Sequence, residues 1–231
     1  MKKFEKNIIA IAICLLATSF TTLDAKAAVL FTDTFDSGVA NSAWGNESGE
    51  WYVHDGVYDT LYPDNAPITY TSVNGATLSN LTDFTVDVDI KSLSDGGIYL
   101  RSTDSLHGIL LVTRGGYDFQ GVYWHVVNGD FSDAYNLTDI ADLRDSNSHI
   151  KVTVEGNTYT AAITNGSGMT VESVFTDSTY TSGKVALYDN SGQSFDNVVI
   201  SGDSPAPAPE PSTLILGFLS LGGLFGLKKR K

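Results

Sequence analysis

One nine-residue segment of the chain concentrates side chains that can contact an organic ligand. Residues 117–125 read YDFQGVYWH and contain four aromatic rings and one imidazole. Successive side chains of a β-strand face opposite sides, so Tyr123 and His125 face outward if Trp124 faces the core. Aromatic rings cover the apolar faces of sugars, and a few polar groups fix the orientation. We therefore predict a sugar-binding patch that includes Tyr117, Tyr123 and His125, the alternative being that such rings only fill a core.

A second segment adds an aromatic ring and a cation to this patch. Residues 97–102 read GIYLRS and are expected to form a strand that brings Tyr99 and Arg101 close to the patch. The planar guanidinium of arginine can donate two hydrogen bonds at once to sugar hydroxyls or to a carboxylate. The alternative for Arg101 is a local salt bridge to Asp87 or Asp104.

The sequence offers one arrangement for acid–base chemistry. Asp87 and Asp89 lie two positions apart and face the same side of an expected strand. A glycosidase needs two carboxyl groups that flank the scissile bond. The alternative is that both form the solvent face of the strand beside Lys91. Because no nucleophile elbow, phosphate-binding loop or zinc-ligand spacing occurs, we assign no catalytic residue and favour binding over catalysis.

The central part of the chain, residues 28–203, is strongly acidic. It carries 24 acidic and six basic residues, a formal charge of −18. Such a surface repels nucleic acid, which is therefore not an expected partner, although solubility alone also explains the charge. The only cysteine, Cys14, precedes this part, which therefore contains neither a disulfide nor a thiol nucleophile.

Alternation of apolar and polar residues dominates the central part. In residues 84–91 (FTVDVDIK) every second residue is apolar, and residues 150–155 (IKVTVE) repeat the pattern. Gly156-Asn157 and Asn128-Gly129 are typical of tight hairpin turns. Many short strands, frequent turn residues and the lack of helical periodicity predict an all-β antiparallel sandwich.

The order of several short motifs resembles that of a known fold family. FTDTFDSG begins at Phe31, GEWYVHDGVY at Gly49, GIYLRS at Gly97, HIKVTVEG at His149 and SFDNVVI at Ser194. This order is similar to the concanavalin A-like jelly roll in its laminin-G-like version, and to the related keto-disaccharide hydrolase domain. The resemblance implies a concave face lined by the strand that ends at Arg101, and a glycan-cleaving hydrolase as an alternative activity. Residues 116–118 (GYD) match the Gly-Tyr-acidic segment of that hydrolase family only loosely.

The same resemblance implies a structural calcium ion between the first and last strands. Ca²⁺ takes roughly six to eight oxygen ligands from carboxylates, amides and backbone carbonyls. Asp33, Asp36, Asp196 and Asn197 lie on the two segments concerned and are the predicted ligands. The alternative is that these residues cap turns and strand ends.

The N-terminal segment is typical of an export signal. Three lysines among the first six residues precede an apolar stretch and the small residues Ala25 and Ala27. This pattern predicts a secretory signal peptide over residues 1–27, exported by the Sec machinery. At the other end, residues 204–208 form a Pro/Ala linker, which is expected to be an extended spacer.

The last 23 residues combine three parts in a set order. Pro209, Glu210 and Pro211 precede an uncharged apolar segment, residues 213–227, and a basic end, residues 228–231. A helix over the apolar segment is about 22 Å long, short of the ~30 Å hydrocarbon core, so it is expected to anchor in the membrane only transiently. This tail resembles the PEP-CTERM sorting signal of exported proteins of Gram-negative bacteria. The resemblance implies cleavage by an exosortase and a host that makes extracellular polysaccharide.

Together these features predict an exported, exosortase-processed protein of the cell surface or extracellular matrix. Its jelly-roll domain, residues 28–203, is expected to bind or pack with extracellular polysaccharide. Two alternatives stay open, namely a hydrolase of the keto-disaccharide type and a purely structural matrix protein.

Overall fold

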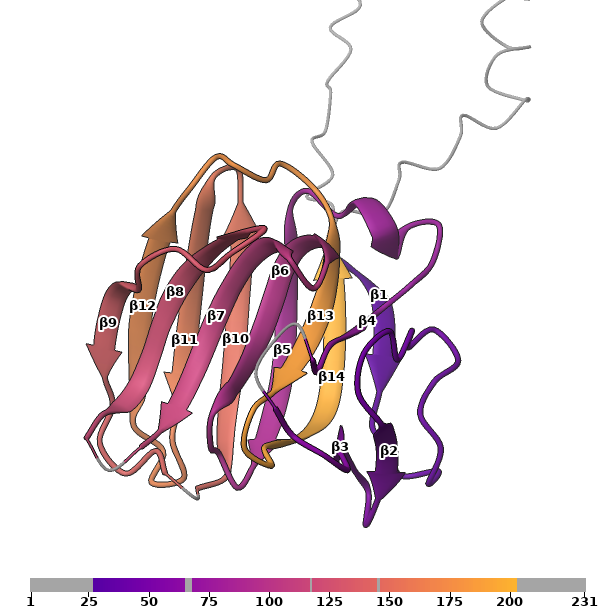
Figure 1. Ribbon diagram of the computed structural model, residues 1–231, viewed down its shortest axis with the longest axis horizontal. Coiled ribbons are helices and arrows are strands. Elements are labelled where there is room, and N and C mark those ends of the chain that lie inside the picture. The colour runs from indigo at the N-terminus through magenta and orange to yellow at the C-terminus, as the bar shows by residue number, and fades with distance from the viewer. Residues whose placement is uncertain (1–26, 65–67, 117, 145, 203–231) are drawn as a thin grey trace, which may run out of the picture.

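The structure, a computed structural model, describes residues 27–64, 68–116, 118–144 and 146–202. These residues form a sandwich of two antiparallel β-sheets (Figure 1). The predicted all-β antiparallel sandwich is thereby confirmed. The predicted linker and sorting tail, and all of the predicted signal peptide except Ala27, lie outside the described residues.

Eight strands form the larger sheet. They are β1 (Ala28–Asp33), β2 (Trp51–His54), β3 (Val57–Thr60), β5 (Phe84–Lys91), β10 (Ser148–Glu155), β11 (Thr158–Thr164), β12 (Thr170–Thr176) and β14 (Ser194–Gly202). Their order across the sheet is β12-β11-β10-β5-β14-β3-β2, and β1 also pairs with β14.

Six strands form the smaller sheet. They are β4 (Thr71–Ser72), β6 (Gly96–Asp104), β7 (His107–Gly115), β8 (Gln120–Asn128), β9 (Tyr135–Asp139) and β13 (Lys184–Asp189). Their order is β4-β13-β6-β7-β8-β9. A short 3-10 helix, η1 (Leu78–Asn80), follows β4. Among the residues that the structure describes, no helix is long and apolar enough to cross a membrane, and the predicted segment 213–227 is not among them.

The core lies between the two sheets and follows from the alternation in the sequence. In β5, Phe84, Val86, Val88 and Ile90 are buried, while the polar residues between them are partly exposed. Apolar residues of β6 and β7 complete the same cluster from the smaller sheet. Removal of this apolar surface from water is the main term that holds the sheets together, at roughly 25 cal/mol per Å².

Strand β7 is buried on both of its faces, unlike β5. Ile109 and Leu111 belong to the core between the sheets, whereas Leu110 and Val112 point the other way. On that outer face they join a second apolar cluster with Tyr70, Tyr99, Val127, Ala186 and Tyr188. The outer side of the smaller sheet therefore carries an apolar cluster of its own, and this is the side that carries the predicted patch.

Both predicted turns are confirmed. Gly156-Asn157 joins β10 and β11, as expected. At Asn128-Gly129 the chain also reverses, because Val127 forms an antiparallel bridge with Phe131, and a short loop then leads to β9, which begins at Tyr135. In this loop the N–H of Ser132 donates to the carbonyl of Val126, and the N–H of Val126 donates to Oγ of Ser132. The loop is thus held against β8.

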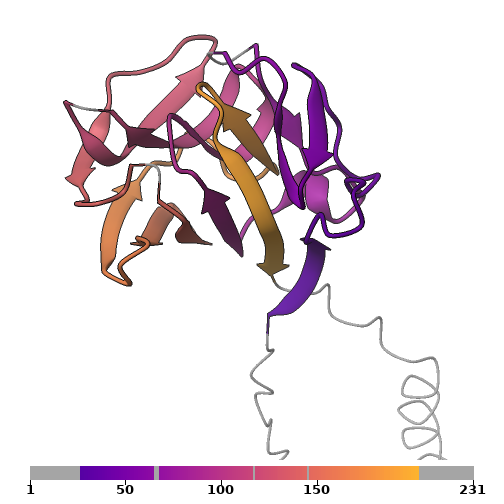
Figure 2. The same ribbon diagram turned by 90° about the horizontal axis from the view of Figure 1, so that it is seen from below.

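The two ends of the described sandwich lie side by side. Ala28 pairs with Gly202, and Figure 2 shows β1 and β14 ending next to each other. Gly202 also pairs with Phe84, the first residue of β5, while Lys91 at the end of β5 pairs with Ser194. The turn that follows β5 therefore lies at the opposite end of the sandwich.

Candidate functional site

Two neighbouring rows of residues cross the outer face of the smaller sheet. Cross-strand pairs between β13, β6, β7 and β8 give a first row of Tyr188, Gly97, Val112 and Tyr123, and a second row of Ala186, Tyr99, Leu110 and His125. Residues opposite one another in paired strands point to the same side of the sheet. The register therefore puts Tyr99, Tyr123 and His125 on one face.

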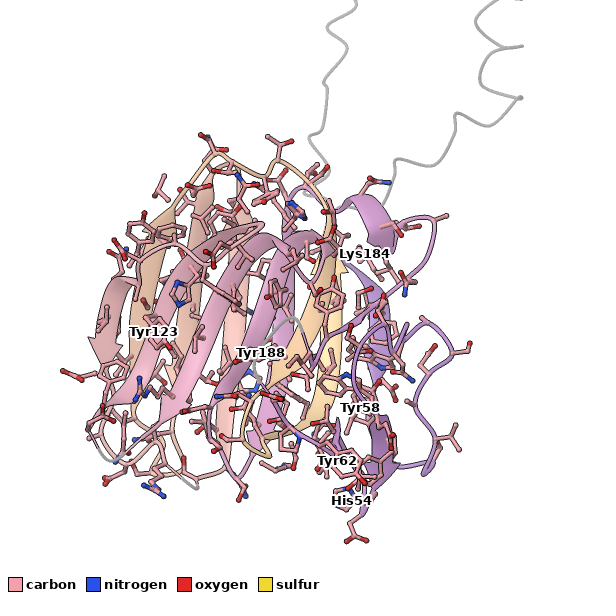
Figure 3. All side chains as sticks on the ribbon, viewed as in Figure 1. His54, Tyr58, Tyr62, Tyr123, Lys184 and Tyr188 are labelled. Carbon is pink, nitrogen blue, oxygen red and sulfur yellow. The ribbon has the colours of Figure 1, made fainter. Side chains whose placement is uncertain are left out.

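A cavity of about 280 Å³ lies over these rows. It is lined by Asp95, Gly96, Leu110, Val112, Arg114, Tyr123, His125, Phe131, Tyr188 and Asn190. Figure 3 shows Tyr123 and Tyr188 on the smaller sheet, which faces the viewer. Leu110 and Val112 are buried and form an apolar base, while aromatic rings and three polar side chains surround it. This composition is typical of small-molecule sites, which are mainly apolar and aromatic with a few convergent polar groups.

The imidazole of His125 is held in one orientation. Its Nδ1 lies 2.8 Å from the carbonyl oxygen of Ser132, in the loop after β8. The ring contacts Tyr123 at 5.2 Å and Phe131 at 5.5 Å between centroids, both in edge-to-face geometry. Burial lowers the pKa of His125, although the Ser132 carbonyl and Asp133 oppose this effect. The side chain is therefore neutral at pH 7, when unperturbed histidine is mostly neutral as well.

Arg114 places a cation at the other side of Tyr123. Its Nη2 lies 3.2 Å from Oδ1 of Asp118 in an exposed ion pair. Its Nε is buried and has no hydrogen-bond partner among the described residues. A buried N–H without an acceptor is costly, and a bound oxygen atom would satisfy it. The hydroxyl of Tyr123 stays protonated because burial raises its pKa.

Asp95 and Asn190 form the polar end of the cavity, and backbone hydrogen bonds fix both turns. Oδ1 of Asp95 accepts from the N–H of Gly115 at 3.1 Å. The Asp95 carbonyl accepts from the N–H groups of Asn190 and Ser191, at 2.9 and 3.1 Å. The turns before β6 and after β13 are thus tied together, so the carboxylate and the amide keep a fixed place beside the aromatic rings.

Arg101 does not line the cavity, which corrects its expected position. Its φ of 50° and the register shift between Leu100 and Asp104 mark a β-bulge in β6. The bulge turns Arg101 to the inner side, where it is 2% exposed and lies 5.4 Å from the ring centroid of Tyr159 in the opposite sheet. Its guanidinium donates to carbonyl and hydroxyl oxygens, not to the carboxylates of Asp87 or Asp104.

Tyr99 lies on the predicted face but beneath the cavity. It is fully buried, and its hydroxyl donates to the carbonyl of Ser105 at 3.1 Å. The ring packs edge-to-face on Tyr70 at 5.4 Å. Tyr99 therefore supports the base of the cavity without reaching a ligand. Tyr117, the remaining predicted member of the patch, lies outside the described residues.

The carboxylates of Asp87 and Asp89 lie on the outer face of the larger sheet, away from this cavity. His149 stands between them, with Nε2 3.4 Å from Asp87 Oδ1 and Nδ1 2.9 Å from Asp89 Oδ1. Lys91 lies 4.0 Å from Oδ2 of Asp89. The interpretation of this pair as a solvent face is therefore confirmed. Among the described residues, Asp95 is the single carboxylate in the cavity lining.

The four residues predicted to bind calcium do not form one site. Asp33 faces the core side of the larger sheet, where its carboxylate accepts from the N–H groups of Phe35, Asn41 and Trp44 Nε1. Asp196 and Asn197 are on the other face, where Nδ2 of Asn197 donates to Asp89 and Asp196 pairs with Lys91, while Asp36 lies in an exposed turn. Within the described residues no group of three or more His, Cys, Asp or Glu could hold a metal ion. Calcium as a cofactor of the protein stays a prediction.

The sequence reasoning missed Arg114, Tyr188 and Phe131. The first has a sequence signal, because the unbroken apolar run of residues 109–112 is typical of a strand covered on both faces, and alternation then puts Arg114 on the side of Leu110. Phe131 also has a signal, because the turn expected at Asn128-Gly129 brings it opposite Val127. Tyr188 depends on the pairing of β13 with β6, which joins strands far apart in sequence.

No protein-family model matches the chain, and no curated protein matches it. Solved structures do. The carbohydrate-binding module CBM66 of Bacillus subtilis matches with a TM-score of 0.52 and 19% identity, over 69% of this chain and 96% of that one. Lectin I-B4 of Griffonia simplicifolia, in a metal-free form, gives 0.52 and 9% over 75% and 99%.

An enzyme also matches. A xylan β-1,4-xylosidase of Bacillus halodurans gives a TM-score of 0.55 and 9% identity over 74% of this chain, which spans only 38% of that enzyme. At such identities these likenesses establish the fold alone. The chain is therefore a lectin-like jelly-roll sandwich in architecture.

Proposed function

We propose that this protein binds an extracellular polysaccharide in the cavity over β7 and β8, without cleaving it. The observation that carries the proposal is one cavity in which an apolar base meets Tyr123, His125 and Phe131 on one side and Asp95 and Arg114 at the end. A sugar ring has apolar faces and a rim of hydroxyls, so it needs both kinds of wall. The solved structures with this fold include a carbohydrate-binding module and a lectin, which supports the same proposal.

The number of carboxyl groups in the cavity is the reason for proposing binding without cleavage. Hydrolysis of a glycosidic bond requires two carboxyl groups, about 5–10 Å apart across the scissile bond. The cavity presents Asp95, and its neighbour Arg114 is a cation. The keto-disaccharide hydrolase alternative relied on Arg101. Its guanidinium is buried in the interior and forms hydrogen bonds there.

We also propose that the protein is exported and works at the cell surface or in the matrix of a Gram-negative bacterium. The signal peptide, the Pro209-Glu210-Pro211 motif and the basic end of the chain support export by Sec, transient anchoring in the inner membrane and processing by an exosortase. The described sandwich fits such a tether, because Ala28 and Gly202 leave it at the end opposite to the turn that holds Asp95. An attachment at that end leaves the cavity free.

Binding of the full-length chain, purified in detergent, to a panel of polysaccharides tests this proposal. We expect saturable binding to one neutral glycan, lost in Tyr123→Ala and kept in the control Tyr62→Ala, whose ring is 68% exposed away from the cavity lining. Sugar released during incubation would favour the hydrolase. No binding to any glycan would overturn the proposal and leave a structural matrix protein.

A further inference from the structure

The hydrogen bond of His125 fixes which ring nitrogen can accept. The partner of Nδ1 is a backbone carbonyl, which can only accept, so Nδ1 carries the hydrogen. In the neutral ring Nε2 then has a free lone pair and is an acceptor. Tyr123 and Phe131 hold the ring edge-to-face on two sides, so it cannot reorient cheaply to exchange these roles.

The groups around His125 favour the neutral ring. Burial is the largest effect, and it lowers the pKa. Tyr123 on β8 stays protonated and uncharged. The charged groups facing the cavity from other elements are Arg114 on β7 and Asp95 before β6, and Asp133 follows in the loop that holds Nδ1. Asp133 favours the imidazolium, but burial outweighs it.

We infer that Nε2 of neutral His125 accepts a hydrogen bond from a hydroxyl of the bound sugar, and that acid therefore releases the glycan. The inference rests on the proposed function and specifies which group of the ligand the site recognises. A protonated ring presents Nε2–H in place of the lone pair, so it cannot accept the hydrogen bond from this hydroxyl. A sugar unit whose hydroxyl at this point is substituted or oxidised to a carbonyl lacks the donor and is rejected.

The sign of the pH dependence follows from this exchange of roles. The binding-competent form is the neutral one, so affinity is full above the pKa of His125 and is lost as the pH falls through it. Each pH unit below the pKa reduces the competent fraction, and hence the affinity, by about tenfold. Carboxyl groups in general also titrate at the acid end, so a matched variant is needed to separate their effect from that of His125.

The experiment is calorimetric titration of the full-length chain in detergent with dextran, mannan, xylan and galactan fragments, at about pH 7.5 and about pH 4.5. We expect the affinity of the wild-type protein to fall by at least tenfold between these pH values. The His125→Gln variant, which stays neutral and keeps an acceptor, should show less than a twofold change. The control His149→Gln alters a histidine on the other sheet and should fall like the wild type.

Two results would overturn the inference while the proposed function stands: an affinity that does not change with pH, or an equal fall in His125→Gln. Failure of every glycan to bind at about pH 7.5 would instead overturn the proposed function. The tautomer and the pKa of His125 can then still be measured by nitrogen-15 NMR of the free protein. An Nε2–H tautomer, or a pKa of His125 at or above the ordinary value, would sink the inference without any ligand.

Discussion

Arg101 should be among the most important single residues for stability. Its Nε and Nη2 donate to the carbonyl of Thr82, at 3.1 and 2.5 Å, and Nη2 also donates to that of Gly156 at 2.6 Å. Nη1 donates to the carbonyl of Tyr180 at 2.9 Å and to the hydroxyl of Tyr159 at 3.2 Å. All five N–H groups of the guanidinium thus have partners. One side chain of the smaller sheet holds three segments that border the larger one.

Replacement of Arg101 by Met should cost about 3–5 kcal/mol of unfolding free energy. The variant removes a buried charge, which is favourable, but leaves the partly buried carbonyls of Thr82, Gly156 and Tyr180 without this donor, at about 1–3 kcal/mol each. Arg101→Lys keeps the charge but has three donors in place of five, and should cost about 2–3 kcal/mol. Equilibrium urea unfolding, followed by tryptophan fluorescence, measures both values.

The matched control is Arg114→Met. That side chain is 38% exposed and its ion pair with Asp118 lies at the surface, so the loss should stay below about 1 kcal/mol. Equal costs for Arg101→Met and Arg114→Met would refute the reasoning, because the guanidinium of Arg101 would then be as solvated as that of Arg114. A cost below about 1 kcal/mol for Arg101→Met would refute it as well.

Three further predictions concern the backbone, the charged outer face and the Asp33 turn. Gly183→Ala should destabilise by more than about 2 kcal/mol in urea unfolding, because a Cβ would lie 2.3 Å from the carbonyl carbon of Arg101 at the bulge. Desolvation raises the pKa of Asp89, but hydrogen bonds from His149 and Asn197 outweigh it and hold the pKa below the ordinary value. Its stabilising contribution is present above the unfolded-state pKa and is lost as the pH falls through the folded one, so His149→Gln should flatten the acid limb of a Tm-versus-pH curve. Asp33→Ala should cost about 2 kcal/mol equally in calcium and in chelator, because its carboxylate caps three N–H groups; a cost seen only in calcium would restore the ion site.

The sequence predicts well wherever side-chain alternation alone decides the structure. Phe84 to Lys91 alternate without interruption, and burial of one face leaves a single register available. Arg101 shows where this reasoning fails. Up to Leu100 the alternation in β6 holds, but one residue with a φ of 50° reverses the faces of everything after it. A bulge is a property of two paired strands, and the sequence of one strand does not contain it.

The candidate site was predictable to the extent that it lies within one strand. Tyr123 and His125 follow directly from the alternation around Trp124, which is buried. Phe131 follows the predicted turn at Asn128-Gly129, which brings it opposite Val127. A contact outside the segment, from the N–H of Gly129 to the carbonyl of Leu106, also holds this turn. Local propensity therefore predicts the strand and the turn, whereas the place of Tyr188 depends on the pairing of β13 with β6.

The packing of β6 against β7 next to the cavity requires a glycine. In the first row across the smaller sheet, Gly97 stands between Tyr188 and Val112. A Cβ at Gly97 would lie 2.3 Å from the carbonyl oxygen of Leu111, so the close approach of β7 excludes every other residue there. The close packing of the two strands thus explains why this position of the row carries no side chain, whereas its other members, Tyr188, Val112 and Tyr123, line the cavity.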